Sequence, residues 1–283
     1  MLVRVDHRAG RIQWRRDVTP AAWIAGRLHL FRHRVDSLVP TGYQTYARLF
    51  HPVESHPAGG TERWAEVARR NGRIAHPRMQ FSSIRSRPGH TALEDVARQG
   101  SPAPGKLPLA ERRALVDLLR AATTTPDRCW FAFREMGFLD DQGVAERVDL
   151  PNHDPLLLHD GPIEMALVPP PERPAGQMQF TTETGGAEEM APAGVLAEES
   201  PAAWWPEDRA WFVATEFQLE STYLGGIFGL SAPRGRPSMP PAWLAASRAM
   251  SMARFELLPL PVSESSRPIG MAFGGSGGSP GSG

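Results

Sequence analysis

The stretch WWPEDRAWFVATEFQLESTYLGG, residues Trp204–Gly226, has the densest aromatic content of the chain and decides the fold. From Trp211 to Glu220 its residues alternate between two sides of an extended chain. One side carries Trp211, Val213, Thr215, Phe217 and Leu219, and the other carries Phe212, Ala214, Glu216, Gln218 and Glu220. A period of two is the side-chain repeat of a β-strand. The pattern therefore predicts one long strand with a core face and a second face that becomes polar toward Glu220.

Other segments predict the elements that surround this strand. RCWFAFR, at Arg128–Arg134, is apolar on both sides, which is typical of a central strand covered on each face. The clearest helix follows Pro108, where leucines recur at helical spacing through LPLAERRALVDLLRAA. Shorter patterns predict strands at Tyr43–Phe50, Arg147–Leu150 and Pro155–His159, and helices that begin at Thr19, Thr61, Ile163 and Pro241, after which Phe255–Val262 leads out of the domain.

The order of these elements lacks a regular strand–helix–strand alternation, which argues against a doubly wound parallel sheet. We expect an α+β fold with a mixed or antiparallel sheet and helices packed mainly on one side. Residues 1–262 are expected to form a single domain. Within it, 169–203 is rich in proline and glycine and predicts a mobile surface loop, and 263–283 ends in GGSGGSPGSG and predicts a flexible tail.

Composition limits the class of protein. No apolar run in the 283 residues is long enough to span a membrane, and the N-terminus lacks the apolar stretch of a secretory signal. The single cysteine, Cys129, excludes an intramolecular disulfide and fits a reducing compartment. We therefore expect a cytoplasmic protein that makes no membrane contact.

Charge is distributed unevenly along a chain whose net charge is zero. Residues 1–130 carry 22 Lys and Arg against 11 Asp and Glu, and residues 131–283 carry 9 against 20. A basic half can indicate an anionic partner such as nucleic acid. The alternative is that the two halves pack together and their charges offset each other. We favour the alternative because the arginines are scattered along predicted elements and form no compact run.

Two sequence patterns suggest chemistry but fail on inspection. Gly100–Lys106 (GSPAPGK) matches the first seven positions of a phosphate-binding P-loop, yet Leu107 stands where Ser or Thr would hold magnesium. The histidines lack the H-E-x-x-H spacing, and no Cys/His grid is present. The sequence thus predicts neither a metal site nor a cofactor. Weak candidates for acid–base catalysis remain, and they are His51, His76, Asp208, Arg209 and Glu216.

Four residues of the central stretch are candidates for binding. Trp204 and Trp205 could form an aromatic surface for a ligand or partner, although core packing is the commoner use of such residues. Ser221 and Thr222, close to Gly225, could bind an anion through hydroxyl and backbone N–H groups. The alternative is that they simply close a strand.

The central stretch also carries a family resemblance. Together with YARLFHP, ERWAEVA, AHPRMQF, TPDRCWFAF and LLLHDGPIEMAL, it resembles a family of uncharacterised actinobacterial proteins over most of residues 40–262. The resemblance implies a cytoplasmic bacterial protein and no established activity.

Three hypotheses of function follow, in the order in which we rank them. The first is a non-enzymatic binding or accessory protein that acts through protein–protein contacts, because no catalytic constellation survives the comparison of motifs. The second is an enzyme of unassigned chemistry, with a His/Asp/Glu pocket under the 169–203 loop. The third is nucleic-acid binding by the arginine-rich first half.

Overall fold

A computed structural model of the chain describes residues 13–29, 35–54, 60–86, 100–135, 145–151, 153–169 and 200–226, and the backbone of Glu256–Leu260. The strands are β1 (Thr45–Phe50), β2 (Val53–Glu54), β3 (Thr61–Glu62), β4 (Cys129–Arg134), β5 (Arg147–Val148), β6 (Leu156–Gly161), β7 (Ala203–Pro206), β8 (Trp211–Thr215), β9 (Ser221–Gly226) and β10 (Glu256–Leu260). The α-helices are α1 (Ala22–Ala25), α2 (Trp64–Arg70), α3 (Phe81–Ile84) and α5 (Leu109–Arg120), and the 3₁₀ helices are η1 (Thr19–Ala21), η2 (Val35–Ser37) and η3 (Ile163–Leu167).

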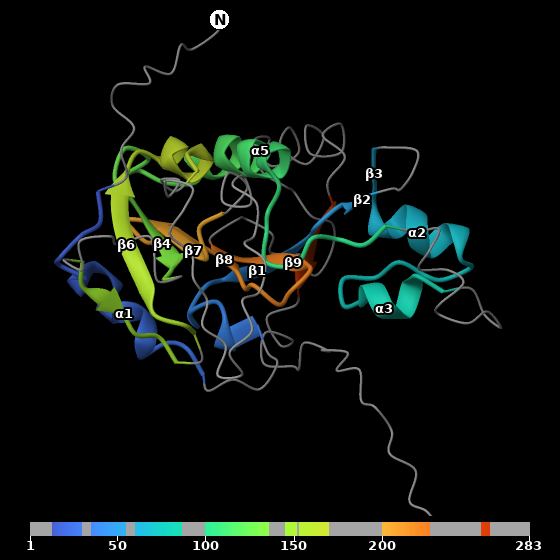
Figure 1. The fold of residues 1–283 in the computed structure, drawn as a ribbon, viewed down its shortest axis with the longest axis horizontal. Helices are drawn as coiled ribbons and strands as arrows, with labels where there is room; N and C mark the ends of the chain where they lie inside the picture. Colours follow the sequence, from blue (N-terminus) through green and yellow to red (C-terminus); the bar gives the residue numbers. More distant parts are fainter. Residues whose placement is uncertain are drawn as a thin grey trace, which may run out of the picture.

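Most of these strands form one eight-stranded sheet in the order β10-β1-β9-β8-β7-β4-β6-β5 (Figure 1). Every neighbouring pair in it runs antiparallel. The short strands β2 and β3 pair separately. The prediction of an α+β fold built on an antiparallel sheet is confirmed.

The stretch Trp204–Gly226 supplies three adjacent strands of this sheet, β7, β8 and β9. Val213 is fully buried, as predicted for an inner strand. The prediction of one strand through Glu220 is wrong, because β8 ends at Thr215 and the chain turns back so that Thr215 pairs with Thr222. Phe217 therefore lies in a turn and is 43% exposed, and Phe212 and Ala214, on the face predicted to grow polar, are buried.

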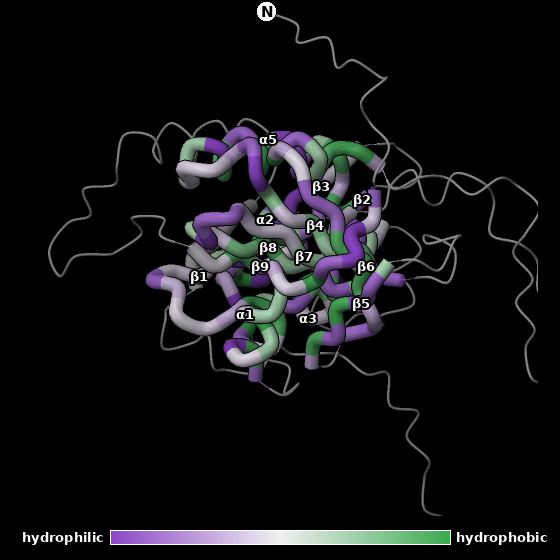
Figure 2. Tube along the Cα trace, turned by 90° about the vertical axis from the view of Figure 1, so that its left-hand side faces the viewer, coloured by the Kyte–Doolittle hydropathy of each residue, from purple (hydrophilic) through white to green (hydrophobic). Residues whose placement is uncertain are grey.

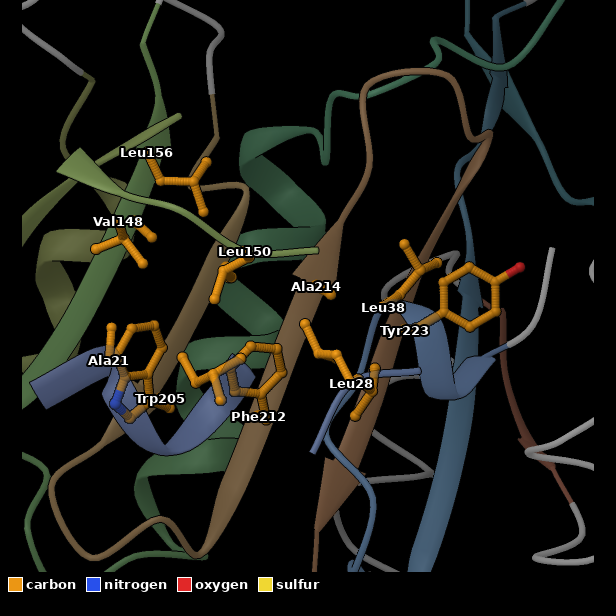
Figure 3. Packing of buried hydrophobic residues seen from close by; sticks show 14 of the residues in the cluster. Ala21, Leu28, Leu38, Val148, Leu150, Leu156, Trp205, Phe212, Ala214 and Tyr223 are labelled. Carbon is orange, nitrogen blue, oxygen red and sulfur yellow. The ribbon is translucent and has the colours of Figure 1, made fainter. Parts of the chain in front are cut away.

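Helical segments cover both faces of the sheet. On one face, α5 and η3 bury leucines of α5 against residues such as Phe131, Trp204 and Val213. On the other face, η1, α1 and η2 pack on Trp205, Phe212 and their neighbours, with α5 behind the strands (Figure 3). Helices packed mainly on one side are thus not confirmed, because the N-terminal segments bring a second apolar layer.

Strand β4 lies between β7 and β6 and is buried on both faces, as its sequence predicts. Phe131 stacks on Trp204 at 6.2 Å between ring centroids, on the α5 side. Trp211, from β8, donates its indole N–H to the carbonyl of Leu119 in α5 at 3.0 Å. In Figure 2 the hydrophobic stretches of chain lie mostly among the central strands and the hydrophilic ones mostly around them.

A smaller unit adjoins the end of β1. Helices α2 and α3, with β2 and β3, lie beside the main sheet (Figure 1). Their apolar side chains pack around Trp64 and around Phe50, the last residue of β1. The prediction of a helix that begins at Thr61 is wrong, because Thr61 belongs to β3. The helix begins at Trp64, and the Glu66 side chain accepts the N–H of Arg63 at 2.9 Å.

Several predictions fall on residues outside those described. These are the helix from Pro241, the tail 263–283 and the interior of the 169–203 loop. The described end of that loop is well packed, because Ser200 is buried and accepts the N–H of Leu107 at 3.2 Å. Among the described helices, none has the length and apolarity needed to cross a membrane.

Candidate functional site

His51 and Thr222 come together at one end of the sheet, although 171 residues separate them in sequence. The ring Nδ1 of His51 lies 2.8 Å from the carbonyl oxygen of Ala103, so Nδ1 carries the proton and donates it. Nε2 must then accept, and the Thr222 hydroxyl donates to it at 3.0 Å. Thr215 donates in turn to the Thr222 oxygen at 2.8 Å. A continuous buried chain of hydrogen bonds results.

Arg48 in β1 occupies the same end of the sheet and is also buried. Its Nε donates to the Ser221 hydroxyl at 3.0 Å, and its Nη1 donates to the carbonyl of Met79 at 2.8 Å. The guanidinium lies over the rings of Phe50 and Trp64, 4.5 and 5.5 Å from their centroids. Arg48 therefore joins the sheet to the chain between α2 and α3 through hydrogen bonds and cation–π contacts. We call Arg48, His51, Thr215, Ser221 and Thr222 the closed end.

The closed end is built for stability and offers no reactive surface. His51, Ser221 and Thr222 are fully buried, so no substrate reaches them. Burial lowers the pKa of His51 to about 4, which keeps the ring neutral at pH 7. The expectation that Ser221 and Thr222 bind an anion is therefore corrected: their hydroxyl groups are used within the sheet. Trp204 and Trp205 are likewise core residues and present no surface to a partner.

Glu216, another acid–base candidate, lies in the turn between β8 and β9. Its carboxylate is mostly buried and lies 3.2 Å from Nδ1 of His153. It also accepts the N–H of Phe217 at 2.9 Å. The carboxylate thus fixes the turn against the segment that leads into β6.

Gly105, which belongs to the rejected P-loop pattern, packs against the turn between β8 and β9. It has φ +68°, and a Cβ there would lie 2.4 Å from the Cα of Phe217. Its N–H donates to the carbonyl of Leu219 at 2.9 Å. This glycine is therefore required by close packing of two backbones and not by a phosphate.

His76 lies in the segment between α2 and α3 and is exposed. The surface around it is basic. Residues 60–86 carry six arginines and two glutamates. The exposed arginines among them are Arg69, Arg70, Arg73 and Arg78. Ile74, which stands in their midst, is 85% exposed and the most exposed large hydrophobic residue of the described chain. We call this surface, residues 69–78, the basic surface.

Asp208 lies in the turn between β7 and β8, at the other end of β8 from Glu216. Its carboxylate accepts the hydroxyl and backbone N–H of Thr124, both at 2.7 Å, and the hydroxyl of Thr123 at 2.8 Å. It also accepts the N–H of Ala210. These hydrogen bonds outweigh desolvation and lower the pKa of Asp208. The residue therefore ties the turn to the chain after α5.

Arg209 follows with a positive φ of 54°, and it is the only non-glycine residue among those described with such a backbone. Its guanidinium lies 4.9 Å from the centroid of the Trp23 ring, and that of Arg27 lies 5.6 Å from the same ring. Tyr43 is close enough for both arginines to lower its pKa, although burial has the larger effect and raises it. We call Trp23, Arg27, Tyr43 and Arg209 the arginine end.

The acid–base candidates do not form one constellation. His51 and Glu216 lie near the β8–β9 turn, and Asp208 and Arg209 lie in the β7–β8 turn. The five residues of β8 separate these turns by roughly 15 Å at the usual rise of a strand. General acid–base catalysis requires groups within hydrogen-bond reach of one proton.

The described part of the chain contains neither a cluster of metal-ligating side chains nor a reactive thiol. No group of three or more His, Cys, Asp or Glu side chains there could hold a metal ion. Cys129 is buried in β4, and burial raises the pKa of its thiol to about 12, so it remains protonated and unreactive.

Sequence reasoning missed Arg48, Trp23, Arg27 and Tyr43. Arg48 interrupts the apolar strand Tyr43–Phe50, and this polar position within a buried strand was the available signal. Trp23, Arg27 and Tyr43 gave none, because only the register of distant strands brings them together.

Three comparisons with known proteins, by family models, by curated sequences and by solved structures, found no match for this chain.

Proposed function

We propose that this chain is a non-enzymatic binding protein that acts in a bacterial cytoplasm through protein–protein contacts. The observation that carries the proposal is the basic surface, where exposed arginines surround the exposed Ile74. Arg70 is paired with Glu62, and residues 69–78 themselves contain four arginines and no acidic residue. A partner with acidic side chains around an apolar contact would complement this surface.

The anchoring of the basic surface supports the same proposal. Arg48 holds the carbonyl of Met79, and Asn71 donates its side-chain N–H to the carbonyl of Ile84 at 2.8 Å. Both contacts are buried and fix the ends of the segment that carries Ile74. A partner would meet a surface whose backbone is already ordered, which reduces the entropy lost on binding.

A comparison of two matched variants tests the proposal. R69Q/R73Q removes two exposed arginines of the basic surface, and R16Q/R113Q removes two exposed arginines elsewhere. Nuclease-treated host lysate is passed over each immobilised protein, and every retained protein is identified, purified and titrated against the wild type. We expect a partner that binds the wild type and R16Q/R113Q, and binds R69Q/R73Q at least about tenfold more weakly. No partner, or equal retention by all three proteins, would contradict the proposal.

Nucleic-acid binding is a separate outcome of the same experiment. In a gel-shift assay at low salt, a labelled duplex that is bound by the wild type and not by R69Q/R73Q would show that the partner is a nucleic acid and not a protein. Ile74 argues for protein, because an apolar side chain at the centre of the surface forms no favourable contact with phosphates.

A further inference from the structure

The arginine end contains buried polar atoms that lack partners among the described residues. Trp23 Nε1 and Tyr43 Oη are both buried, and neither makes a hydrogen bond there. A buried polar group without a hydrogen bond destabilises a fold by about 1–3 kcal/mol. Two such groups in one place are thus costly, unlike the fully bonded groups of the closed end.

The sheet places the rings of Trp23 and Tyr43 at adjoining positions on one face. Phe212 pairs with Gly225, and Gly225 pairs with Tyr46, so these residues form a row across β8, β9 and β1. The Trp23 ring lies edge-on to Phe212 at 6.0 Å, and Tyr43 lies edge-on to Tyr46 at 6.4 Å. Trp23 and Tyr43 therefore occupy adjoining positions above the row.

Gly225 makes room for this arrangement. A Cβ on Gly225 would lie 2.5 Å from the ring of Tyr43 and 2.7 Å from a methyl group of Val39. Only glycine lets the tyrosine ring rest directly on the sheet. The position of Tyr43 is therefore set by the fold and not by a flexible surface loop.

Two exposed guanidinium groups complete the arrangement. Arg27 and Arg209 both lie close to the Trp23 ring, and neither has a carboxylate within salt-bridge distance among the described residues. Asp208, the nearest acidic neighbour along the chain, already accepts four hydrogen bonds at its carboxylate. Those donors are neutral, so Asp208 keeps its negative charge, which also acts on Tyr43, and it offsets part of the positive charge of the two arginines.

The backbone conformation of Arg209 is also unusual. A left-handed conformation at a non-glycine residue costs on the order of 1 kcal/mol and occurs in tight turns and at functional sites. Asp208 holds the turn in this conformation through its bonds to Thr123 and Thr124. The turn thus directs Arg209 toward Trp23 at a cost in stability.

We propose that the arginine end binds a phosphate-type oxyanion. Two exposed guanidinium groups, offset in part by Asp208, leave a net positive charge for the oxyanion, and the indole N–H and phenol O–H of the half-buried residues Trp23 and Tyr43 supply donors to further oxygens. A tetrahedral oxyanion can accept hydrogen bonds from several directions, whereas one planar carboxylate is saturated by a single arginine fork. Burial raises the pKa of Tyr43, so its hydroxyl stays protonated and remains a donor.

Calorimetric titration with inorganic phosphate, at constant ionic strength and pH 7.5, tests the proposal. We expect saturable binding to the wild type, which R27Q/R209Q weakens at least about tenfold. R69Q/R73Q loses the same charge from the basic surface and should bind phosphate like the wild type. Tyr43→Phe keeps both arginines and should weaken binding severalfold, and thermal melts of each variant without phosphate verify folding.

Three results would overturn the proposal. They are the absence of saturable binding in the millimolar range, equal binding by R27Q/R209Q and the wild type, and binding of acetate as tight as that of phosphate. A parallel titration with phenyl phosphate distinguishes the source of the anion. Tighter binding than phosphate supports a phosphorylated molecule as the ligand, and weaker binding supports free phosphate.

Discussion

The two ends of strands β1, β9 and β8 differ in how their buried polar atoms are paired. At the closed end, both ring nitrogens of His51 and both threonine hydroxyl groups are bonded within the protein. At the arginine end, Trp23 and Tyr43 each bury a polar atom without a partner among the described residues. The comparison teaches that burial of a polar residue does not by itself mark a binding site, and that an unpaired buried polar atom is the feature that requires an explanation.

The largest effect is expected from Gly105→Ala, which lies against the β8–β9 turn beside the closed end. The new Cβ would overlap the backbone of Phe217, so one of the two chains must move. We expect the free energy of unfolding to fall by about 3 kcal/mol or more in urea melts. Gly72→Ala is the matched control, because Gly72 has the same φ of +68° but no atom within 4 Å. It should cost only about 1 kcal/mol, and equal losses would refute the packing argument.

The next effect is a pH dependence set by His51. Its pKa is about 4 in the folded protein and 6.5 in the unfolded chain, so the unfolded state binds more protons between these values. The free energy of unfolding should therefore fall as pH is lowered from 6.5 to 4, by on the order of 3 kcal/mol from this residue.

Urea melts across this pH range, compared between the wild type and His51→Gln, isolate this contribution from other titrating groups. His76→Gln changes an exposed histidine and should leave the wild-type slope intact. If the slope in His51→Gln equals that of the wild type, His51 is not held neutral by burial.

A smaller effect on the free energy of unfolding is expected when the hydrogen bonds between His51, Thr222 and Thr215 are removed. Thr222→Val leaves Nε2 of His51 without a donor and should cost about 1–3 kcal/mol. Thr215→Val removes only the hydroxyl that donates to Thr222. Because the two hydroxyl groups are bonded to each other, the double variant should lose less than the two single losses added together. Additive losses of stability in a double-mutant cycle would show that the two threonine hydroxyl groups are not coupled to each other.

The sequence predicts the elements better than it predicts their contacts. Strand β4 and helix α5 were found because their signals, apolar residues on both faces and a helical repeat, lie within a few residues. The turn after Thr215 was missed because Glu216 to Glu220 contains no glycine, proline, asparagine or aspartate and continues the alternation by chance.

The sites depend on residues far apart in the chain, and this is why sequence alone found so little of them. His51 was identified as a candidate, but its neutrality follows from Ala103 and Thr222, which no local pattern connects to it. For Trp204 and Trp205 the sequence left a binding surface open beside the commoner use in a core, until their strand was placed inside the sheet. The neighbourhood of Trp23 and Tyr43 likewise requires the register of β1, β9 and β8.

The most direct test of the contrast between the two ends is to remove one hydroxyl from each and measure the free energy of unfolding in phosphate-free buffer. Thr222→Val removes a bonded hydroxyl, and Tyr43→Phe removes a buried hydroxyl that has no partner among the described residues. We predict a loss of about 1–3 kcal/mol for Thr222→Val and no loss, or a gain of up to about 1 kcal/mol, for Tyr43→Phe. A loss in Tyr43→Phe as large as that in Thr222→Val would contradict the account, because both ends would then be equally satisfied.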